Sequence, residues 1–184
     1  MSAIRNIDQL NSEIARGARP DYLFFWGHTP TKDGSVSKAC FSQWWVAPFV
    51  VDDLTYPSAE HYMMASKARL FGDDAALKRV LNADTPKQAK EIGRQVQGFD
   101  EAMWKQACFP LVVAGNLAKF SQHPPLRDFL LGTGDNVLVE ASPYDRIWGI
   151  GLAASDELAG QPAKWRGLNL LGFALMEVRE RLKT

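Results

Sequence analysis

The stretch from Tyr56 to Ala68 decides the fold of this chain, and it reads YPSAEHYMMASKA. Ser58 follows a proline, and its hydroxyl can accept a hydrogen bond as the N-cap of a helix. Glu60 falls in the first turn, where a carboxylate suits the positive end of the helix dipole. The helical pattern continues to Phe71 and stops at Gly72. The sequence therefore predicts a helix that opens at Ser58 and runs to Phe71.

One face of this helix combines charged and apolar side chains. Glu60 and Lys67 fall on the same stripe by the 3.6-residue repeat, with apolar residues beside them. They are roughly 10 Å apart along the helix axis, which is too far for a tight ion pair. Two interpretations stay open: a solvated face of an amphipathic helix, or one polar pocket that receives both side chains. In the second, Glu60 is a general base and Lys67 holds a phosphate or a sugar-bound oxygen.

Strands are predicted on both sides of this helix. Residues Tyr22–Trp26 form a dense aromatic run between a proline and a glycine, which favours a buried strand. Residues Phe49–Tyr56 indicate a β-hairpin that turns at Asp52-Asp53. Val137–Glu140 is a further short strand.

Helices fill most of the remaining chain. The run Thr85–Gln88 is a strong helix start, because threonine caps, proline suits the first position and glutamine closes a capping box. Asp100 can cap the next helix, and Asn169 can cap the last one. The predicted helices cover Ile7–Arg16, Asp73–Asn82, Pro86–Gln97, Glu101–Phe120, Leu126–Leu131 and the segment from Asn169 to Leu182. This order favours the α+β class, as a single, mostly helical domain around a small β-sheet.

Length and composition fit one globular domain. The chain has 184 residues, of which 46% are hydrophobic and 23% are charged. We predict a peripheral N-terminal helical extension over residues 1–20 and one domain over residues 21–184. The formal net charge is zero, so the chain lacks the electrostatic footprint of a dedicated duplex binder.

Targeting signals and a disulfide framework are not expected. The start of the chain lacks the apolar core of a secretory signal, and no apolar stretch reaches the ~18 residues that span a membrane. Cys40 and Cys108 are isolated in the sequence, which fits a reducing compartment. We therefore expect a cytoplasmic protein with no membrane partner.

Common cofactor motifs are missing or stand in the wrong context. No Gly-x-x-x-x-Gly-Lys loop occurs. His28, His61 and His123 lack metal-ligand spacing, so no metal site is predicted. Gly149–Ala154 matches the loose Gly-x-Gly-x-x-Ala dinucleotide pattern, but no strand directly precedes it and no long helix follows. The sequence therefore predicts no cofactor.

Aromatic side chains next to glycines are candidates for ligand binding. The chain has six tryptophans, and Trp26 and Trp148 each precede a glycine. A flat ring in such a place can stack a base, while nearby backbone amides, such as those of Gly149 and Gly151, can meet a phosphate. For Trp45 this interpretation and core packing have equal support.

Asp145 lies shortly before Trp148, and it has two interpretations. It can form an Asx-turn after Pro143. It can also act with Glu60 as the second of two carboxylates, an arrangement that cleavage of a glycosidic bond usually needs.

An ordered series of motifs resembles the NADAR family, named for a proposed link to NAD and ADP-ribose. The series comprises Phe24–Gly27, Phe41–Trp44, Tyr56–Ala68, Lys90–Arg94, Trp104, Lys119-Phe120, Leu130–Thr133, Asp145–Gly151 and Asn169–Met176. It runs from about Tyr22 to Arg181, which is nearly the whole chain. The resemblance implies a single α+β, mostly helical domain that needs no metal.

The resemblance also implies N-glycosidase activity, and therefore a hydrolase acting on N-glycosyl bonds. Members are described as hydrolysing phosphoribosylated intermediates of riboflavin biosynthesis, and others as removing ADP-ribose from modified guanine in nucleic acid. Carried over by motif, the residues lining the active site would be Glu60, Lys67, Asp145 and Trp148, with Trp26, Gly27 and Asn169 near it.

The residues and the resemblance lead to one mechanistic hypothesis. The base of the substrate stacks on a tryptophan, and its sugar phosphate is held by Lys67 and by Arg94 or Arg146, together with backbone amides. Glu60 stabilises an oxocarbenium-like sugar and activates water. Asp145 orients the ribose hydroxyls or assists the leaving nitrogen.

Two alternatives stay open at this level. Lys67 either contacts the phosphate or, if desolvated, attacks an opened sugar aldehyde as a Schiff-base amine. The protein could also be a non-catalytic module that binds ADP-ribose or a nucleotide, since stacking rings and glycine loops serve binding equally well. The variant Glu60→Gln separates an enzyme from such a binding module, because only an enzyme has turnover to lose.

Overall fold

The computed structural model describes residues 4–183, and the chain divides into two compact units. One unit is continuous and spans Ser42–Pro124. The other is assembled from the chain up to Phe41 and from Pro125 onward. Among the described residues, no helix is long and apolar enough to cross a membrane.

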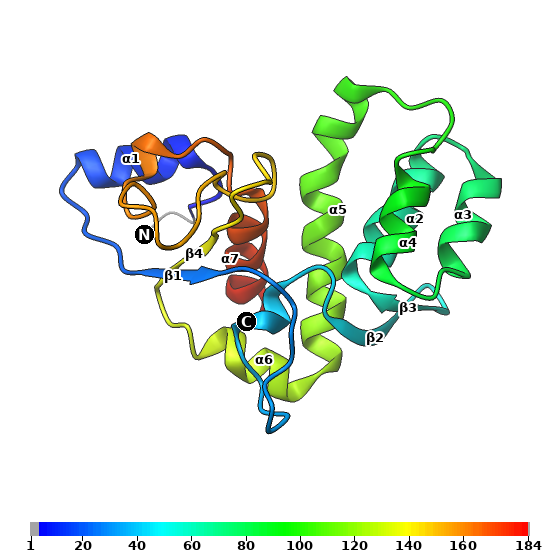
Figure 1. The fold of residues 1–184 in the computed structure, drawn as a ribbon, viewed down its shortest axis with the longest axis horizontal. Coiled ribbons are helices and arrows are strands. Elements are labelled where there is room, and N and C mark those ends of the chain that lie inside the picture. The colour runs from blue at the N-terminus through cyan, green and yellow to red at the C-terminus, as the bar shows by residue number, and fades with distance from the viewer. Residues whose placement is uncertain (1–3, 184) are drawn as a thin grey trace. The chain divides into compact units, whose positions relative to one another are not determined.

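The continuous unit carries a β-hairpin and a group of helices (Figure 1). Its elements are β2 (Val46–Val51), β3 (Leu54–Ser58), α2 (Ala59–Leu70), α3 (Asp74–Leu81), α4 (Pro86–Gly93) and α5 (Glu101–Gln122). Strands β2 and β3 pair antiparallel, and α2 packs against α3, α4 and α5. Helix α2 is therefore the central element of this unit.

Local sequence signals set most ends of these elements. Asp52 and Asp53 take positive φ angles of 49° and 61°, the conformation of a two-residue hairpin turn, and they confirm the predicted turn. Ser58 caps α2, and Thr85 with Gln88 forms the predicted capping box of α4.

Helix α4 ends earlier than the sequence predicts, at Gly93 rather than near Gln97. The cause is Asp73, whose carboxylate accepts the backbone N–H groups of Gln97 (2.9 Å) and Ala76 (2.8 Å). These bonds lower the pKa of Asp73, and they draw the chain after Gly93 toward the start of α3. A tertiary contact therefore overrides the helical signal of the last predicted turn.

The other unit combines a parallel strand pair with helices from both parts of the chain (Figure 1). Its elements are α1 (Ile7–Ala15), β1 (Tyr22–Phe25), the 3₁₀ helix η1 (Lys38–Phe41), α6 (Pro124–Leu131), β4 (Val137–Glu140), the 3₁₀ helix η2 (Pro162–Lys164) and α7 (Leu170–Leu182). Strand β1 pairs parallel with β4, with Tyr22 opposite Val137. Helix α7 packs on β4, and its residues from Leu171 to Arg179 are buried, so α7 forms the core of this unit.

The α+β class is confirmed, but the strands form two ladders rather than one small sheet. Strands β1 and β4 make one two-stranded sheet, and β2 and β3 make another. The aromatic run is also only partly buried: β1 ends at the buried Phe25, and Trp26 lies exposed beyond it. The sequence predicts a buried strand here, and this prediction is only partly correct, because aromatic content alone does not say which residues the partner strand covers.

Helix α1 packs within this same unit, which is built from the two ends of the chain. Leu10 is fully buried, and Arg5 forms a 2.7 Å ion pair with Glu177 of α7. The predicted division into an extension over residues 1–20 and a domain over residues 21–184 stays a prediction.

Candidate functional site

Glu60 lies in the first turn of α2 and is almost fully buried, at 3% exposure. Its backbone N–H donates to the carbonyl of Gln43 at 2.9 Å. The next N–H, that of His61, reaches the Ser58 hydroxyl at 3.4 Å. These bonds satisfy donors that a helix start otherwise leaves unpaired. A solvated face is therefore the wrong interpretation for Glu60, whose carboxylate is enclosed by the fold.

His61, the neighbour of Glu60, is held as a neutral imidazole. Its Nε2 lies 3.0 Å from the carbonyl oxygen of Ala83, which can only accept, so Nε2 carries the proton. Its Nδ1 then accepts the hydroxyl proton of Ser58 at 2.7 Å. Burial lowers the pKa of His61 and keeps the ring neutral. The helix start that carries Glu60 is thereby fixed on its buried side.

The amine of Lys67 lies near the other end of α2, in an aromatic environment. Its Nζ donates to the carbonyl of Gly93 at 2.8 Å. The same atom lies 4.3 Å from the ring centroid of Phe99 and 5.6 Å from that of Trp104. Burial lowers the pKa of Lys67, because loss of water disfavours the charged amine. Lys67 is therefore easier to deprotonate than a surface lysine.

Two further predicted residues of this unit are less enclosed. Arg94 follows Gly93 at the C-cap of α4 and is exposed, next to the carbonyl that holds Lys67. Trp45 is half-buried before β2, and its backbone N–H donates to the carbonyl of Ser42 at 3.2 Å. The structure thus places Arg94 beside the Lys67 contact.

Sequence reasoning missed a cluster of buried polar side chains on α5. Asn116 and Lys119 are both fully buried. The Asn116 amide donates to the Gln43 side chain at 2.7 Å, and the Lys119 amine donates to the Ser42 carbonyl at 3.1 Å. A signal was present, because these polar residues interrupt an apolar helix face at helical spacing.

In the other unit, Asp145 organises the loop from Ser142 to Gly151. Its Oδ1 accepts the backbone N–H groups of Ile147 at 2.8 Å and Trp148 at 2.7 Å, which is the predicted Asx-turn. The Ser142 hydroxyl accepts the N–H of Asp145 at 3.2 Å. Asp145 therefore has a structural role in this loop, and its catalytic role stays a prediction.

Gly149 and Gly151 allow this loop to pack tightly. A Cβ at Gly149 would lie 2.9 Å from the carbonyl oxygen of Glu140, and Gly151 has a positive φ of 68°. The N–H of Gly151 donates to the carbonyl of Asp145 at 3.0 Å. The Gly151 amide is a predicted donor to a phosphate, but in the structure it already donates a hydrogen bond within the loop.

Asn169 occupies the N-cap position of α7, but its side chain does not cap the helix, contrary to the prediction. Its Oδ1 accepts the N–H of Glu140 and its Nδ2 donates to the carbonyl of Leu138, both at 2.9 Å. The side chain therefore pairs with the backbone of β4 instead of the helix. Its own N–H reaches the carbonyl of Gly149 at 3.1 Å, which joins the start of α7 to the Asp145 loop.

Trp26 presents an exposed aromatic surface, with Tyr144 beside it. Their ring centroids are 6.0 Å apart, and the residues are 56% and 85% exposed. Gly27 follows with a positive φ of 82°, and Trp148 in the neighbouring loop is half-buried. Trp26 therefore lies against the Asp145 loop, through its contact with Tyr144. An exposed aromatic surface of this kind is one on which a base can stack.

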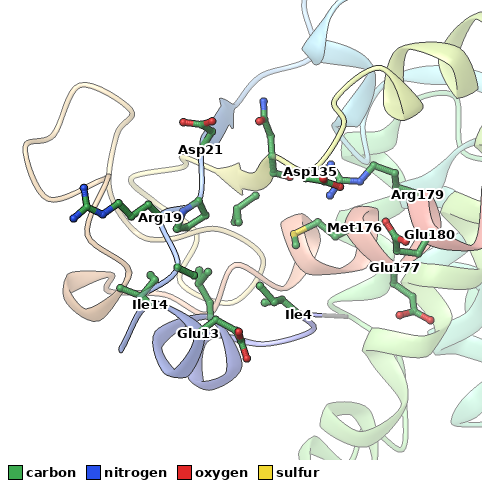
Figure 2. A pocket seen from close by; sticks show the side chains of 15 residues that line it. Ile4, Glu13, Ile14, Arg19, Asp21, Asp135, Met176, Glu177, Arg179 and Glu180 are labelled. Atoms are coloured by element: carbon green, nitrogen blue, oxygen red, sulfur yellow. Dashed lines mark hydrogen bonds between the residues drawn. The ribbon is translucent and has the colours of Figure 1, made fainter. Parts of the chain in front are cut away.

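A separate pocket of about 630 Å³ lies in this same unit, beside α1 and α7 (Figure 2). Its lining combines apolar side chains, such as Ile14 and Met176, with charged ones, such as Glu13 and Arg179. None of the predicted site residues lines it. Within residues 4–183, no group of three or more His, Cys, Asp or Glu side chains is placed to hold a metal ion.

Comparison with known proteins decides the family. The NADAR domain family model matches residues 24–183, which is most of the chain. The chain belongs to the NADAR domain family. The resemblance seen in the motifs is thereby confirmed. An N-glycosidase of Acanthamoeba polyphaga mimivirus is 42% identical over 164 residues, which cover 86% of this chain and 95% of the relative.

Two further relatives support the NADAR assignment. The N-glycosidase YbiA of Escherichia coli K12 is 32% identical over 142 residues, or 77% of this chain and 80% of the relative. The NMR structure of E. coli YbiA matches with a TM-score of 0.69 and 28% identity, covering 90% of this chain and 87% of that chain. The chloroplastic riboflavin biosynthesis protein PYRR of Zea mays is 34% identical over 138 residues, or 71% of this chain and 20% of the relative.

Proposed function

We propose that this protein is an N-glycosidase, a hydrolase that cleaves the bond between C1′ of a ribosyl group and the nitrogen of a base. The observation that carries the proposal is the buried carboxylate of Glu60, on a helix start held by backbone hydrogen bonds. Cleavage of a glycosidic bond needs a carboxylate whose position is set before the transition state forms. The mimivirus and E. coli relatives, both named N-glycosidases, support the same class of reaction.

The proposed substrates are phosphoribosylated intermediates of riboflavin biosynthesis or guanine bases that carry ADP-ribose. Both contain a ribosyl phosphate and present a similar base edge. The maize relative, a riboflavin biosynthesis protein, favours the first. The exposed pair of Trp26 and Tyr144 is compatible with either, because a flat aromatic surface can stack both bases.

In the proposed reaction the bond between C1′ and the base nitrogen breaks with oxocarbenium character. The base nitrogen leaves with the electron pair of that bond and takes up a proton. The Glu60 carboxylate stabilises the positive charge on the sugar and removes a proton from the attacking water, whose oxygen forms the new bond to C1′. Asp145 contributes its second carboxylate oxygen, since Oδ1 holds the loop, and this oxygen orients the ribose hydroxyls or assists the leaving nitrogen.

The remaining predicted residues have supporting roles in this proposal. Stacking of the base is assigned to Trp26 and Trp148. A phosphate contact is assigned to Arg94, which is exposed at the end of α4. Asn169 is a positioning residue, because both ends of its amide are bonded to β4.

A second route to the same products gives Lys67 the role of an amine nucleophile rather than a phosphate contact, and the amine instead of water then attacks C1′. Its lowered pKa raises the share of neutral amine, and desolvated lysines of this kind form Schiff bases with carbonyl carbons. In this route O4′ takes the electron pair of the C1′–O4′ bond and a proton as the ring opens. Nζ then forms a bond to C1′, and the base leaves with the electron pair of its own bond to C1′ and the proton that Nζ gives up. Water then hydrolyses the resulting imine and restores the amine.

A mass-spectrometric hydrolysis assay tests the proposed activity. Wild type, Glu60→Gln and the control Glu91→Gln, an exposed residue of α4, are each given two substrates. One is the aminopyrimidine ribosylamine phosphate of riboflavin synthesis, and the other is a guanosine oligonucleotide carrying ADP-ribose. We expect wild type and the control to release ribose 5-phosphate or ADP-ribose. Glu60→Gln should lose turnover about 100-fold or more while it keeps its affinity.

The alternative class gives a different result in the same assay. A non-catalytic module would bind one of the two compounds and release no free sugar phosphate from either. That outcome would contradict the proposal and leave Glu60 as a recognition residue.

Borohydride reduction during turnover tests the role of Lys67. A Schiff base would be reduced to a stable sugar adduct, which peptide mass spectrometry should locate on Lys67. Lys67→Arg should form no adduct, whereas the control Lys90→Arg on α4 should form as much as wild type. The value of kcat/KM should rise with pH above neutrality, with an apparent pKa below the usual 10.5. Wild-type turnover in Lys67→Arg would contradict the nucleophile role and leave a phosphate contact as the role of Lys67.

A further inference from the structure

A buried pair of amide side chains, Gln43 and Asn116, joins helix α5 to the segment that precedes β2. Asn116 is fully buried and Gln43 is 7% exposed. The Nδ2 of Asn116 donates to Oε1 of Gln43 at 2.7 Å and to the carbonyl oxygen of Val112 at 2.9 Å. A carbonyl oxygen only accepts, so the Val112 contact determines which end of the Asn116 amide carries the N–H groups. The orientation of the Gln43 amide follows from that of Asn116.

The same segment holds the start of α2. The carbonyl of Gln43 accepts the N–H of Glu60 at 2.9 Å, and the carbonyl of Ser42 accepts the Lys119 amine at 3.1 Å. Asn116 and Lys119 lie on one face of α5, so this face holds two successive residues of the segment. A path of hydrogen bonds therefore runs from α5 through Gln43 to the residue that carries the proposed catalytic carboxylate.

Close packing makes α5 a rigid support for α2. A Cβ at Gly115, the residue before Asn116, would overlap the ring of Tyr62 on α2. The two helices therefore approach closely at the level of the amide pair. The path through Gln43 starts from an element that is itself fixed against α2.

Stability alone does not explain this pair. Nε2 of Gln43 and Oδ1 of Asn116 are buried and have no hydrogen-bond partner among the described residues. Buried polar atoms without partners are unfavourable, and an apolar pair of the same shape is often neutral or stabilising. An amide pair in this place therefore indicates that its hydrogen bond is needed to hold the segment before β2 in position.

We propose that Gln43 and Asn116 are positioning residues for Glu60, and that they set the rate of glycosidic cleavage by holding the first turn of α2 in place. The inference rests on the proposed function of Glu60. A catalytic group displaced by about 1 Å can lose about 100-fold in rate. Loss of the amide pair should therefore lower kcat and leave KM nearly unchanged, because neither amide needs to touch the substrate.

The test replaces the pair by apolar residues of similar shape, Gln43→Met together with Asn116→Leu. The matched control is Gln122→Met, which removes an amide that joins the same helix to Val50 of β2 by hydrogen bonds of 2.9 and 2.8 Å. We expect the double variant to melt at or above the wild-type temperature while kcat falls about 10- to 100-fold, with KM within about twofold. The control should keep the wild-type kcat. In a Glu60→Gln background the double variant should lose no further activity.

Amide hydrogen exchange separates this inference from the proposed function. The exchange rate of the Glu60 N–H, followed by NMR, reports on its bond to Gln43 without any substrate. We expect exchange about tenfold faster in the double variant and unchanged in Gln122→Met. If the double variant does not fold, the single Gln43→Met is measured in the same way.

The outcomes are distinct. An unchanged Glu60 exchange rate in the variant would overturn the inference, whatever happens to its melting temperature, and so would an unchanged kcat in an active protein. A wild type without turnover would refute the proposed function, and the exchange rate alone would then decide whether the pair positions Glu60.

Discussion

At the scale of single residues, the buried side of α2 sets a pH response. His61 is neutral in the folded protein, because the Ala83 carbonyl and the Ser58 hydroxyl fix its tautomer and burial lowers its pKa. In the unfolded chain the same imidazole titrates near 6.5, its ordinary value. Between the two pKa values only the unfolded chain binds the proton, so acid favours unfolding in that window.

We predict that the free energy of unfolding falls as the pH is lowered from 7 to 5, by up to about 1.4 kcal/mol per pH unit from this group. His61→Gln, which does not titrate, should flatten the slope. Urea unfolding at steps of half a pH unit measures the slope. Equal slopes in wild type and His61→Gln would contradict the assignment.

Substitutions of Asp145 can distinguish the effect of its charge from that of its hydrogen bonds to the loop. Asp145→Asn keeps an oxygen that can accept the N–H groups of Ile147 and Trp148, but it removes the charge. We predict that it stays within about 0.5 kcal/mol of wild type in stability and loses about 10- to 100-fold in kcat. Asp145→Ala should lose both stability and turnover. Urea unfolding and the hydrolysis assay measure the two effects, and wild-type kcat in Asp145→Asn would assign the residue to the turn alone.

At the scale of elements, the approach of α5 to α2 depends on a missing side chain. Gly115 leaves room for the Tyr62 ring, which is bulky and cannot move aside as a flexible chain can. A glycine inside a helix is otherwise unfavourable by about 1 kcal/mol relative to alanine. The close contact therefore outweighs local helix propensity at this position.

We predict that Gly115→Ala lowers the free energy of unfolding by about 1–3 kcal/mol. Gly93→Ala should cost less, because the atoms it would meet belong to the flexible side chain of Met64. Gly160→Ala is the control, since nothing lies within 4 Å of its added Cβ. Chemical denaturation ranks the three variants. A Gly115→Ala protein as stable as the control would contradict the prediction, because it would show that α5 and α2 can shift to admit the methyl group without loss of stability.

At the scale of the whole molecule, the balance of charge limits the kind of substrate. The formal net charge is zero, so few phosphates of a long nucleic acid can be neutralised at once. Recognition of a modified base should then depend on the base and its attached sugar phosphate rather than on the polymer.

We predict that kcat/KM for an ADP-ribosylated oligonucleotide falls by less than about tenfold between 50 and 200 mM salt, whereas a protein with 6–10 phosphate contacts loses about 10³–10⁵ in affinity. The small ribosylamine phosphate serves as the comparison in the same buffers. Steady-state kinetics at both salt concentrations measure the ratio. A thousandfold fall for the oligonucleotide would indicate an extended nucleic-acid surface and contradict the prediction.

Features that depend on neighbours in the sequence could be predicted from it. The helix start at Ser58, the hairpin turn at Asp52-Asp53 and the capping box at Thr85 each need only residues within one turn of chain. The α+β class follows from the same local patterns, and the family follows from the order of the motifs. For the candidate site, this level of information places Glu60 and Lys67 on one helix.

Features that depend on distant residues required the fold itself. The parallel pairing of β1 with β4, the bonds of Asn169 to β4 rather than to its own helix, and the burial of Asn116 against Gln43 all join segments far apart in the chain. Local spacing does not specify such partners, because they meet only after the helices and strands have packed. For the same reason the end of α4 at Gly93 was set by Asp73, a residue of another element, and not by the helical signal around it.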